Sequence, residues 1–297
     1  MTRHRAVPAG AALAAMLAAG TAAAQQPSQA LAVQQLAPNV YWVTGGGGNS
    51  GIVIGTTGVV VIDAKTTPAS GKALLDEVAK LTPKPVTHVI LTHSDGDHVN
   101  GLASFPATVT VIAQQGAKRE MDAALAAGGR GAPPADHMPS KVIDADGEHL
   151  TLDGVAFELH HWAPAHTSGD LVVYLPAQRI VFTGDIIATN RPDPLIHLEK
   201  NGSSAGWITT VQGLLGLDAD RFVPGHGELQ AKADIQTRLE SATKKRASIA
   251  TLVKQGKSLD EIRAAVGDPA PTGAGGRGGG FASFTEVVYR ELTSSAR

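Results

Sequence analysis

The sequence of 297 residues contains no cysteine, which excludes disulfide bonds, thiolate nucleophiles and any metal site built on sulfur. Aromatic residues make up only 4% of the chain, so the core must consist mainly of aliphatic side chains. The net charge of −2 gives no support for nucleic-acid binding, and we expect no nucleic-acid partner. The chain is nevertheless long enough to bury a sizeable core without covalent cross-links.

The first 24 residues have the three-part layout of a secretory signal peptide. Arg3 and Arg5 precede an apolar run from Ala6 to Gly20, and a small-residue cleavage site ends at Ala24. A short membrane anchor is the alternative, but this run is shorter than the roughly 20 residues that cross a bilayer. We therefore expect cleavage after Ala24 and no stable membrane insertion afterwards. The protein would be periplasmic or secreted, with a net charge of −4 because two arginines are lost.

The remaining residues, 25–297, predict a single α/β domain in which two blocks of strands are flanked by helices. Short apolar runs between turn residues predict the strands, and periodic apolar faces predict the helices. The predicted strands are 40–44, 52–54, 59–62, 86–91, 109–112, 150–152, 155–160, 171–175, 180–182 and 221–223, and the predicted helices are 68–81, 115–125, 204–215, 231–254 and 258–267. Stretches rich in glycine and proline predict a loop or lid at 128–140 and a mobile loop at 269–280.

Four potential metal ligands follow the predicted strand 86–91, namely His93, Asp95, Asp97 and His98. Four such residues at this spacing cannot all point one way on a regular strand, but they can converge where the chain turns. Imidazole and carboxylate together suit zinc, iron or manganese. The alternative interpretation is a polar loop with incidental histidines.

Three further ligand-type residues lie in predicted turns beside strands. His166 precedes the strand 171–175, Asp185 follows the strand 180–182, and His226 follows the strand 221–223. A lone histidine in a turn is more often an ordinary surface residue, so each position alone is a weak signal. Their occurrence together, in this order, indicates one metal centre.

This set of motifs resembles the metallo-β-lactamase superfamily of metallo-hydrolases. The family motif is His-x-His-x-Asp-His, followed by a distant His, an Asp and a His, and the resemblance runs from Val40 to Ala231. It implies a four-layer αβ/βα sandwich with the site at one edge, between the two sheets. It also implies two divalent metal ions, zinc or alternatively iron or manganese. By position, His93 and His166 would hold the first ion, Asp97, His98 and His226 the second, and Asp185 would bridge them.

One position departs from the family pattern, because Asp95 stands where the second histidine is usual. A carboxylate can still ligate zinc or iron, so Asp95 remains a candidate ligand of the first ion. The flavodiiron branch of the superfamily has a glutamate at the same place and binds two irons. The alternative for Asp95 is a loop residue that caps nearby backbone amides.

The implied function is a secreted metal-dependent hydrolase that acts on a small molecule. A metal-bound hydroxide would attack the carbonyl carbon of an ester, lactone, thioester or amide, and a β-lactam is one candidate substrate. Asp97 would be the catalytic residue that orients the hydroxide and shuttles its proton. The alternative is a periplasmic accessory protein whose metal site is non-catalytic or, as Asp95 suggests, of a di-iron redox type. The sequence does not specify an oligomeric state.

Overall fold

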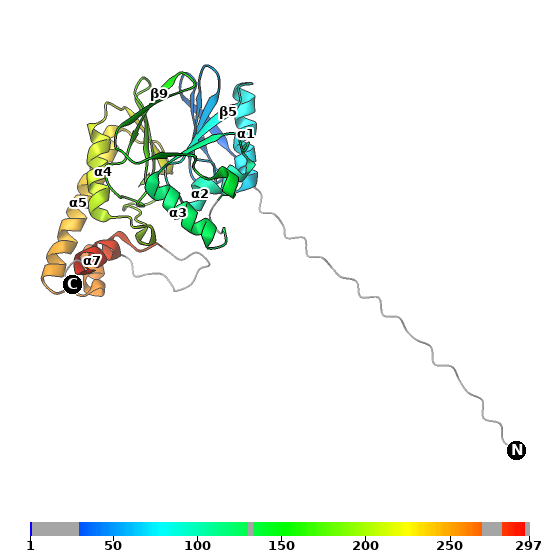
Figure 1. Ribbon diagram of the computed structural model, residues 1–297. Helices are drawn as coiled ribbons and strands as arrows, with labels where there is room; N and C mark the ends of the chain where they lie inside the picture. The colour runs from blue at the N-terminus through cyan, green and yellow to red at the C-terminus, as the bar shows by residue number, and fades with distance from the viewer. Residues whose placement is uncertain (2–29, 130–132, 269–280, 295–297) are drawn as a thin grey trace.

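The computed structural model describes residue 1 and residues 30–129, 133–268 and 281–294. In these residues two β-sheets pack face to face and helices cover both outer faces, which confirms the expected four-layer αβ/βα sandwich (Figure 1). The predicted signal peptide, apart from Met1, and the predicted loop 269–280 lie outside the described residues. No helix within the described ranges combines the length and apolar character needed to cross a membrane.

The first sheet contains seven strands in the order in which they occur along the chain. They are β1 (Ala32–Ala37), β2 (Val40–Thr44), β3 (Ser50–Ile54), β4 (Val59–Ile62), β5 (Val86–Ile90), β6 (Thr110–Gln114) and β7 (Lys141–Ile143). Neighbours from β1 to β4 are antiparallel, and neighbours from β4 to β7 are parallel. Parallel neighbours need crossover connections. These contain α1 (Pro68–Leu81), α2 (Gly96–Val99) with the 3₁₀ turn η1 (Asn100–Ser104), and α3 (Gln115–Ala126) with η2 (Ala135–His137).

The second sheet contains five strands in the order β12-β11-β10-β9-β8. They are β8 (Glu148–Leu152), β9 (Val155–His160), β10 (Val172–Leu175), β11 (Ile180–Ala188) and β12 (Arg221–His226). Only β11 and β12 are parallel, and the connection between them contains η3 (Leu198–Lys200) and α4 (Ser204–Gly216). The chain continues with α5 (Lys232–Lys254), α6 (Leu259–Val266) and α7 (Phe284–Ser294).

Alternating side chains of the central strands fill three separate core layers. In β4, Val60 and Ile62 belong to the cluster between the sheets, whereas Val59 and Val61 belong to the cluster under α1. Strands buried on both faces appear in a sequence as continuous apolar runs. This is why the sequence predicts strands such as 59–62 with the observed bounds.

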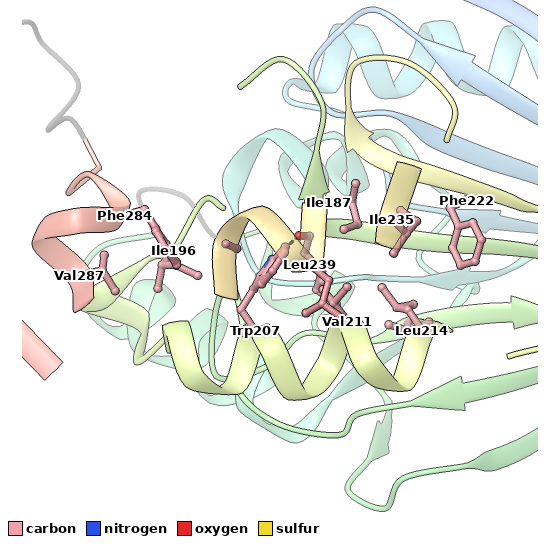
Figure 2. Close-up of a cluster of buried hydrophobic side chains, with 14 of the residues drawn as sticks. Ile187, Ile196, Trp207, Val211, Leu214, Phe222, Ile235, Leu239, Phe284 and Val287 are labelled. Atoms are coloured by element: carbon pink, nitrogen blue, oxygen red, sulfur yellow. Dashed lines mark hydrogen bonds between the residues drawn. The ribbon is translucent and has the colours of Figure 1, made fainter. Parts of the chain in front are cut away.

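The third core layer lies between the second sheet and the helices α4, α5, α6 and α7 (Figure 2). Trp207 of α4 is at its centre, only 2% exposed, and its indole N–H donates to the carbonyl of Ile186 at 2.6 Å. Leu239 of α5 and Phe284 of α7 belong to the same cluster. The C-terminal helices therefore stabilise the sheet that carries Asp185.

Several elements differ from the sequence prediction. The strands β1 and β7 and the helices α2 and α7 were not predicted. β1 is an edge strand with the sequence AVQQLA and only one buried residue, and α2 is a single helical turn. β11 and β12 are longer than expected, so Asp185 lies inside β11 and His226 is the last residue of β12, and the prediction of turns at these positions is wrong. The predicted loop 128–140 contains η2, and residues 130–132 of it lie outside the described residues.

Replacing Trp207 with alanine should lower the free energy of unfolding by about 3–5 kcal/mol, because a large buried side chain is lost. Trp207→Phe is the matched control, since it keeps an aromatic ring and removes the donor to Ile186, at a cost of about 1–2 kcal/mol. Chemical denaturation monitored by circular dichroism measures both. Equal decreases in the free energy of unfolding of the two variants would contradict a packing role for the indole.

Candidate metal centre

The structure brings all seven predicted ligands together beside the carboxyl ends of β5 and β12. They come from four segments of the chain: the loop after β5 and the start of α2, the turn before β10, the strand β11 and the end of β12. The seven residues are His93, Asp95, Asp97, His98, His166, Asp185 and His226. All seven appear in three clusters whose ligand atoms lie within 4.8 Å of one another, and Asp95 shares its cluster with His166 and His197.

One cluster, called here the second site, consists of Asp97, His98 and His226. The Nε2 atom of His226 lies 3.0 Å from Asp97 Oδ2 and 3.4 Å from His98 Nε2. Another cluster, called here the first site, contains His93 and His166, with Asp95 Oδ2 3.0 Å from His166 Nε2 and 3.9 Å from His93 Nε2.

Asp185 lies between the two sites. Its Oδ1 atom is 3.3 Å from His98 Nε2 and 3.5 Å from His226 Nε2, and its Oδ2 atom is 3.9 Å from His166 Nε2. Each carboxylate oxygen thus faces a different site, which is the arrangement that a bridging ligand requires.

Two buried ligand atoms in this centre have no hydrogen-bond partner among the described residues, namely His93 Nε2 and Asp185 Oδ1. An unsatisfied buried polar atom costs about 1–3 kcal/mol. A cation between these atoms would remove that cost. The donor set consists of imidazoles and carboxylates without sulfur, and zinc, iron and manganese accept such a set. The residues present therefore fit divalent metal ions.

The side chain of Asp63 orients two of the imidazoles. Its Oδ2 atom lies 2.8 Å from His98 Nδ1 and also accepts a hydrogen bond at 2.7 Å from Thr92 Oγ1, which in turn lies 2.9 Å from His93 Nδ1. With Nδ1 occupied, the Nε2 atom of each ring is directed to the centre. Asp63 was not predicted as a site residue, although a carboxylate directly after the buried strand 59–62 was an available signal.

The turn that carries His166 is fixed by the buried carboxylate of Asp170. This carboxylate accepts hydrogen bonds from Thr167 N at 3.0 Å, Thr167 Oγ1 at 2.8 Å and Ala165 N at 3.2 Å. Burial raises the pKa of Asp170 to about 6. His166 Nδ1 lies 3.0 Å from the carbonyl oxygen of Leu195, so its Nε2 atom is free to face the first site.

Asp95 occupies the N-cap position of α2, but its side chain makes no capping hydrogen bond. The capping alternative for this residue is therefore not supported. Its Oδ2 atom faces His166, and its Oδ1 atom lies 2.5 Å from Lys200 Nζ and 3.4 Å from His197 Nδ1. Lys200 was not selected from the sequence, because no local pattern connects it to Asp95.

The protein environment favours the protonation states that metal binding requires at two of these positions. Burial, followed by the nearby charge of His98, lowers the pKa of His93 to about 3, so this imidazole is neutral. Burial alone would raise the pKa of Asp185, but the charge of His98, followed by that of His166, outweighs this effect and holds its pKa well below the usual range. Asp185 is therefore ionised.

A buried lysine supports the loop that covers His98. Lys65 is completely buried, and its Nζ atom donates to the carbonyls of Val43 at 2.9 Å and Gly48 at 2.8 Å. Burial lowers the pKa of Lys65 to about 7. Gly48 lies directly against the imidazole, since a Cβ atom there would come within 2.2 Å of His98 Cε1. The loop therefore approaches the second site as closely as glycine permits.

Replacing Asp63 with asparagine should weaken metal binding by about 10- to 100-fold, because the imidazole of His98 loses its charged partner. The measurement is competition for zinc with a chromogenic chelator. Asp76→Asn is the control, since Asp76 is an exposed residue of α1 paired with Lys72. Unchanged affinity in Asp63→Asn would contradict the orienting role.

Replacing Lys65 with methionine should make the stability difference from the wild type depend on pH. Because the folded-state pKa of Lys65 is lowered, its contribution is fully present only above pH 10.5 and is lost as the pH falls through about 7. Between these two pH values, the free energy of unfolding of the wild type should therefore rise with pH by roughly 1 kcal/mol per pH unit relative to that of Lys65→Met. Denaturation between pH 6 and 9 measures the difference, with the exposed Lys80→Met as control. A constant difference would show that Lys65 keeps an ordinary pKa.

Comparisons with known proteins agree with this fold. A sequence profile described as the metallo-beta-lactamase superfamily matches residues 43–226. The chain is 28% identical over 189 residues to 2,4-dinitroanisole O-demethylase subunit alpha of Nocardioides sp. (strain JS1661), covering 63% of this chain and 55% of that protein. It is 25% identical over 187 residues to metallo-beta-lactamase type 2 of Bacillus cereus, covering 61% of this chain and 68% of that protein.

Among solved structures, the sec-alkylsulfatase Pisa1 from Pseudomonas sp. superposes with a TM-score of 0.68 at 20% identity, covering 88% of this chain and 50% of that chain. At this identity the likeness shows the fold alone. The chain spans about half the length of the O-demethylase subunit and of the sulfatase. The family profile, in contrast, covers more than half of the chain and includes every predicted ligand from His93 to His226. The chain therefore belongs to the metallo-beta-lactamase superfamily.

Proposed function

We propose that the protein is a hydrolase that uses two divalent metal ions, zinc in the first instance, to cleave an ester, lactone, thioester or amide bond in a small molecule. The observation that carries this proposal is the convergence of seven imidazole and carboxylate side chains at one centre, where the buried atoms His93 Nε2 and Asp185 Oδ1 have no hydrogen-bond partner among the described residues. Iron or manganese would also suit this donor set. We further propose that the protein is exported, on the basis of the leader-like sequence 1–24.

In this proposal the two sites divide the ligands as their positions suggest. The first site would use His93, Asp95 and His166, the second site would use Asp97, His98 and His226, and Asp185 would bridge them. Two such ions, when bound, supply Lewis acidity toward a carbonyl oxygen and a source of nucleophilic water.

Asp97 is suited to orient a reacting water and to accept a proton. Its side chain is 38% exposed, against 3% for Asp185 and 10% for Asp95, so it is the ligand carboxylate most open to a substrate. Burial alone would raise the pKa of Asp97, but the hydrogen bond from His226 and the charge of His98 outweigh burial and keep the pKa below its usual value. The lowered pKa keeps Asp97 ionised, so its carboxylate can accept a hydrogen bond from the reacting water and orient it, and a proton taken up from that water would be held only transiently.

The substrate class is left to experiment because the superfamily fold serves several reactions. The relatives carry the names of an O-demethylase, a β-lactamase and a sulfatase, and these names describe different leaving groups. A shared fold does not select among them, since function lies in the site and its loops. A β-lactam is the first candidate, because an exported hydrolase would meet such compounds outside the cytosol.

Purified protein should contain about two equivalents of metal, and chelation should abolish its activity on a panel of chromogenic β-lactams, lactones and thioesters. Elemental analysis identifies the metal, and added zinc should restore turnover. The variant with both His93→Ala and His98→Ala should be inactive, whereas His149→Ala, at a 73% exposed side chain of β8, should not.

Turnover that persists in the double variant would contradict the proposed function. Iron without zinc, together with an absence of hydrolysis across the panel, would instead favour the redox alternative.

A further inference from the structure

Lys200, at the end of η3, is a cation next to the first site that the proposed hydrolysis does not use. Its Nζ atom lies 2.5 Å from Asp95 Oδ1 and donates to Ser94 Oγ at 2.7 Å. Its side chain is 23% exposed and that of Asp95 is 10% exposed, so the ion pair is only partly open to solvent. Screening by water is weaker for such a pair than for a pair on an open surface.

Backbone hydrogen bonds fix η3 against the turn that carries His166. The amide of Ser168 donates to the carbonyl of Lys200 at 2.8 Å, and the amide of His197 donates to the carbonyl of His166 at 2.7 Å. The main chain at Lys200 is therefore held to the same turn as His166, and its side chain is held to Asp95. A lysine fixed at both ends loses little additional freedom when it pairs with a carboxylate.

Hydrogen bonds among Ser94, Ser168 and Glu120 extend the polar network around Lys200. Ser94 donates to Glu120 Oε2 at 2.5 Å, and Ser168 donates to Glu120 Oε1 at 2.7 Å. Ser94 is thus fixed between Glu120 and Lys200. This arrangement directs the ammonium group of Lys200 toward Asp95 Oδ1 and leaves Oδ2 on the side of His166 and His93.

The two sites consequently differ in charge. Among the described residues, the ion pairs of Asp97 in the second site are with His98 and His226, and no lysine is among them. The carboxylate of Asp95 in the first site is paired with the ammonium group of Lys200. A positive charge opposes the binding of a dication nearby, and it also withdraws negative charge from the ligand oxygen.

We propose that Lys200, through its ion pair with Asp95, lowers the affinity of the first site for divalent metal ions and makes this site the weaker of the two. The second site fills first, and occupancy of the first site depends on the Lys200–Asp95 pair. The inference rests on the metal binding contained in the proposed function and does not depend on the substrate.

The test is a competitive titration of the metal-free full chain with zinc and a chromogenic chelator, which yields two dissociation constants. Lys200→Met should tighten the weaker site by about tenfold, because a nearby positive charge is removed, and should leave the stronger site within about twofold. Lys200→Gln is a second neutral variant in case the first does not fold, and circular dichroism checks both. Lys200→Arg keeps the charge and should retain the wild-type constants.

The matched control is Lys141→Met, which removes another partly exposed lysine that pairs with a carboxylate, Glu148, on the outer strand β7. It should change neither constant. An unchanged or weakened weaker site in both neutral Lys200 variants would overturn the inference.

The same titration separates the two proposals. A protein that shows the predicted Lys200 dependence but cleaves no substrate contradicts the proposed hydrolysis alone. A protein that hydrolyses a substrate, but whose zinc dissociation constant at the weaker site is unchanged in the Lys200 variants, contradicts this inference alone.

Discussion

The concentration of buried charge at one edge of the sandwich is the constraint on which the rest of the structure depends. Histidines and aspartates removed from water cost several kcal/mol each unless they are paired or bind a cation. Ion pairs within the protein offset part of this cost, because Asp63 pairs with His98 and Lys200 pairs with Asp95. The buried atoms His93 Nε2 and Asp185 Oδ1, which have no hydrogen-bond partner among the described residues, are the part that remains, and a bound cation would offset it.

The sandwich holds this centre rigidly because its ligands stand on or next to packed elements. The strand β11 carries Asp185 between the core layer around Trp207 and the layer between the sheets. Hydrogen bonds hold the loops around the centre in place. Lys65 donates to the loop over His98, and the main chain at Lys200 is hydrogen-bonded to the turn that carries His166. Ligands on elements of this kind keep their geometry without a loop that must first become ordered.

The sequence predicted most of the fold, because strands such as 59–62 are buried on both faces and appear as continuous apolar runs. The edge strand β1 lacks such a run and was missed. The ligand types were visible because histidines and aspartates lie beside the predicted apolar strands and occur together in one order along the chain. The supporting residues were not visible, because Lys200 meets Asp95 only across 105 positions of the chain, and a contact of that span leaves no local pattern.

Crystallography of the purified protein with anomalous diffraction at the absorption edge of its metal tests the central claim most directly. The account predicts two anomalous peaks, one bounded by His93 and His166 and one bounded by His98 and His226, with the carboxylate of Asp185 between them. The second peak should be at least as strong as the first. Peaks at other side chains, or ordered side chains at this edge with no peak between them, would contradict the account.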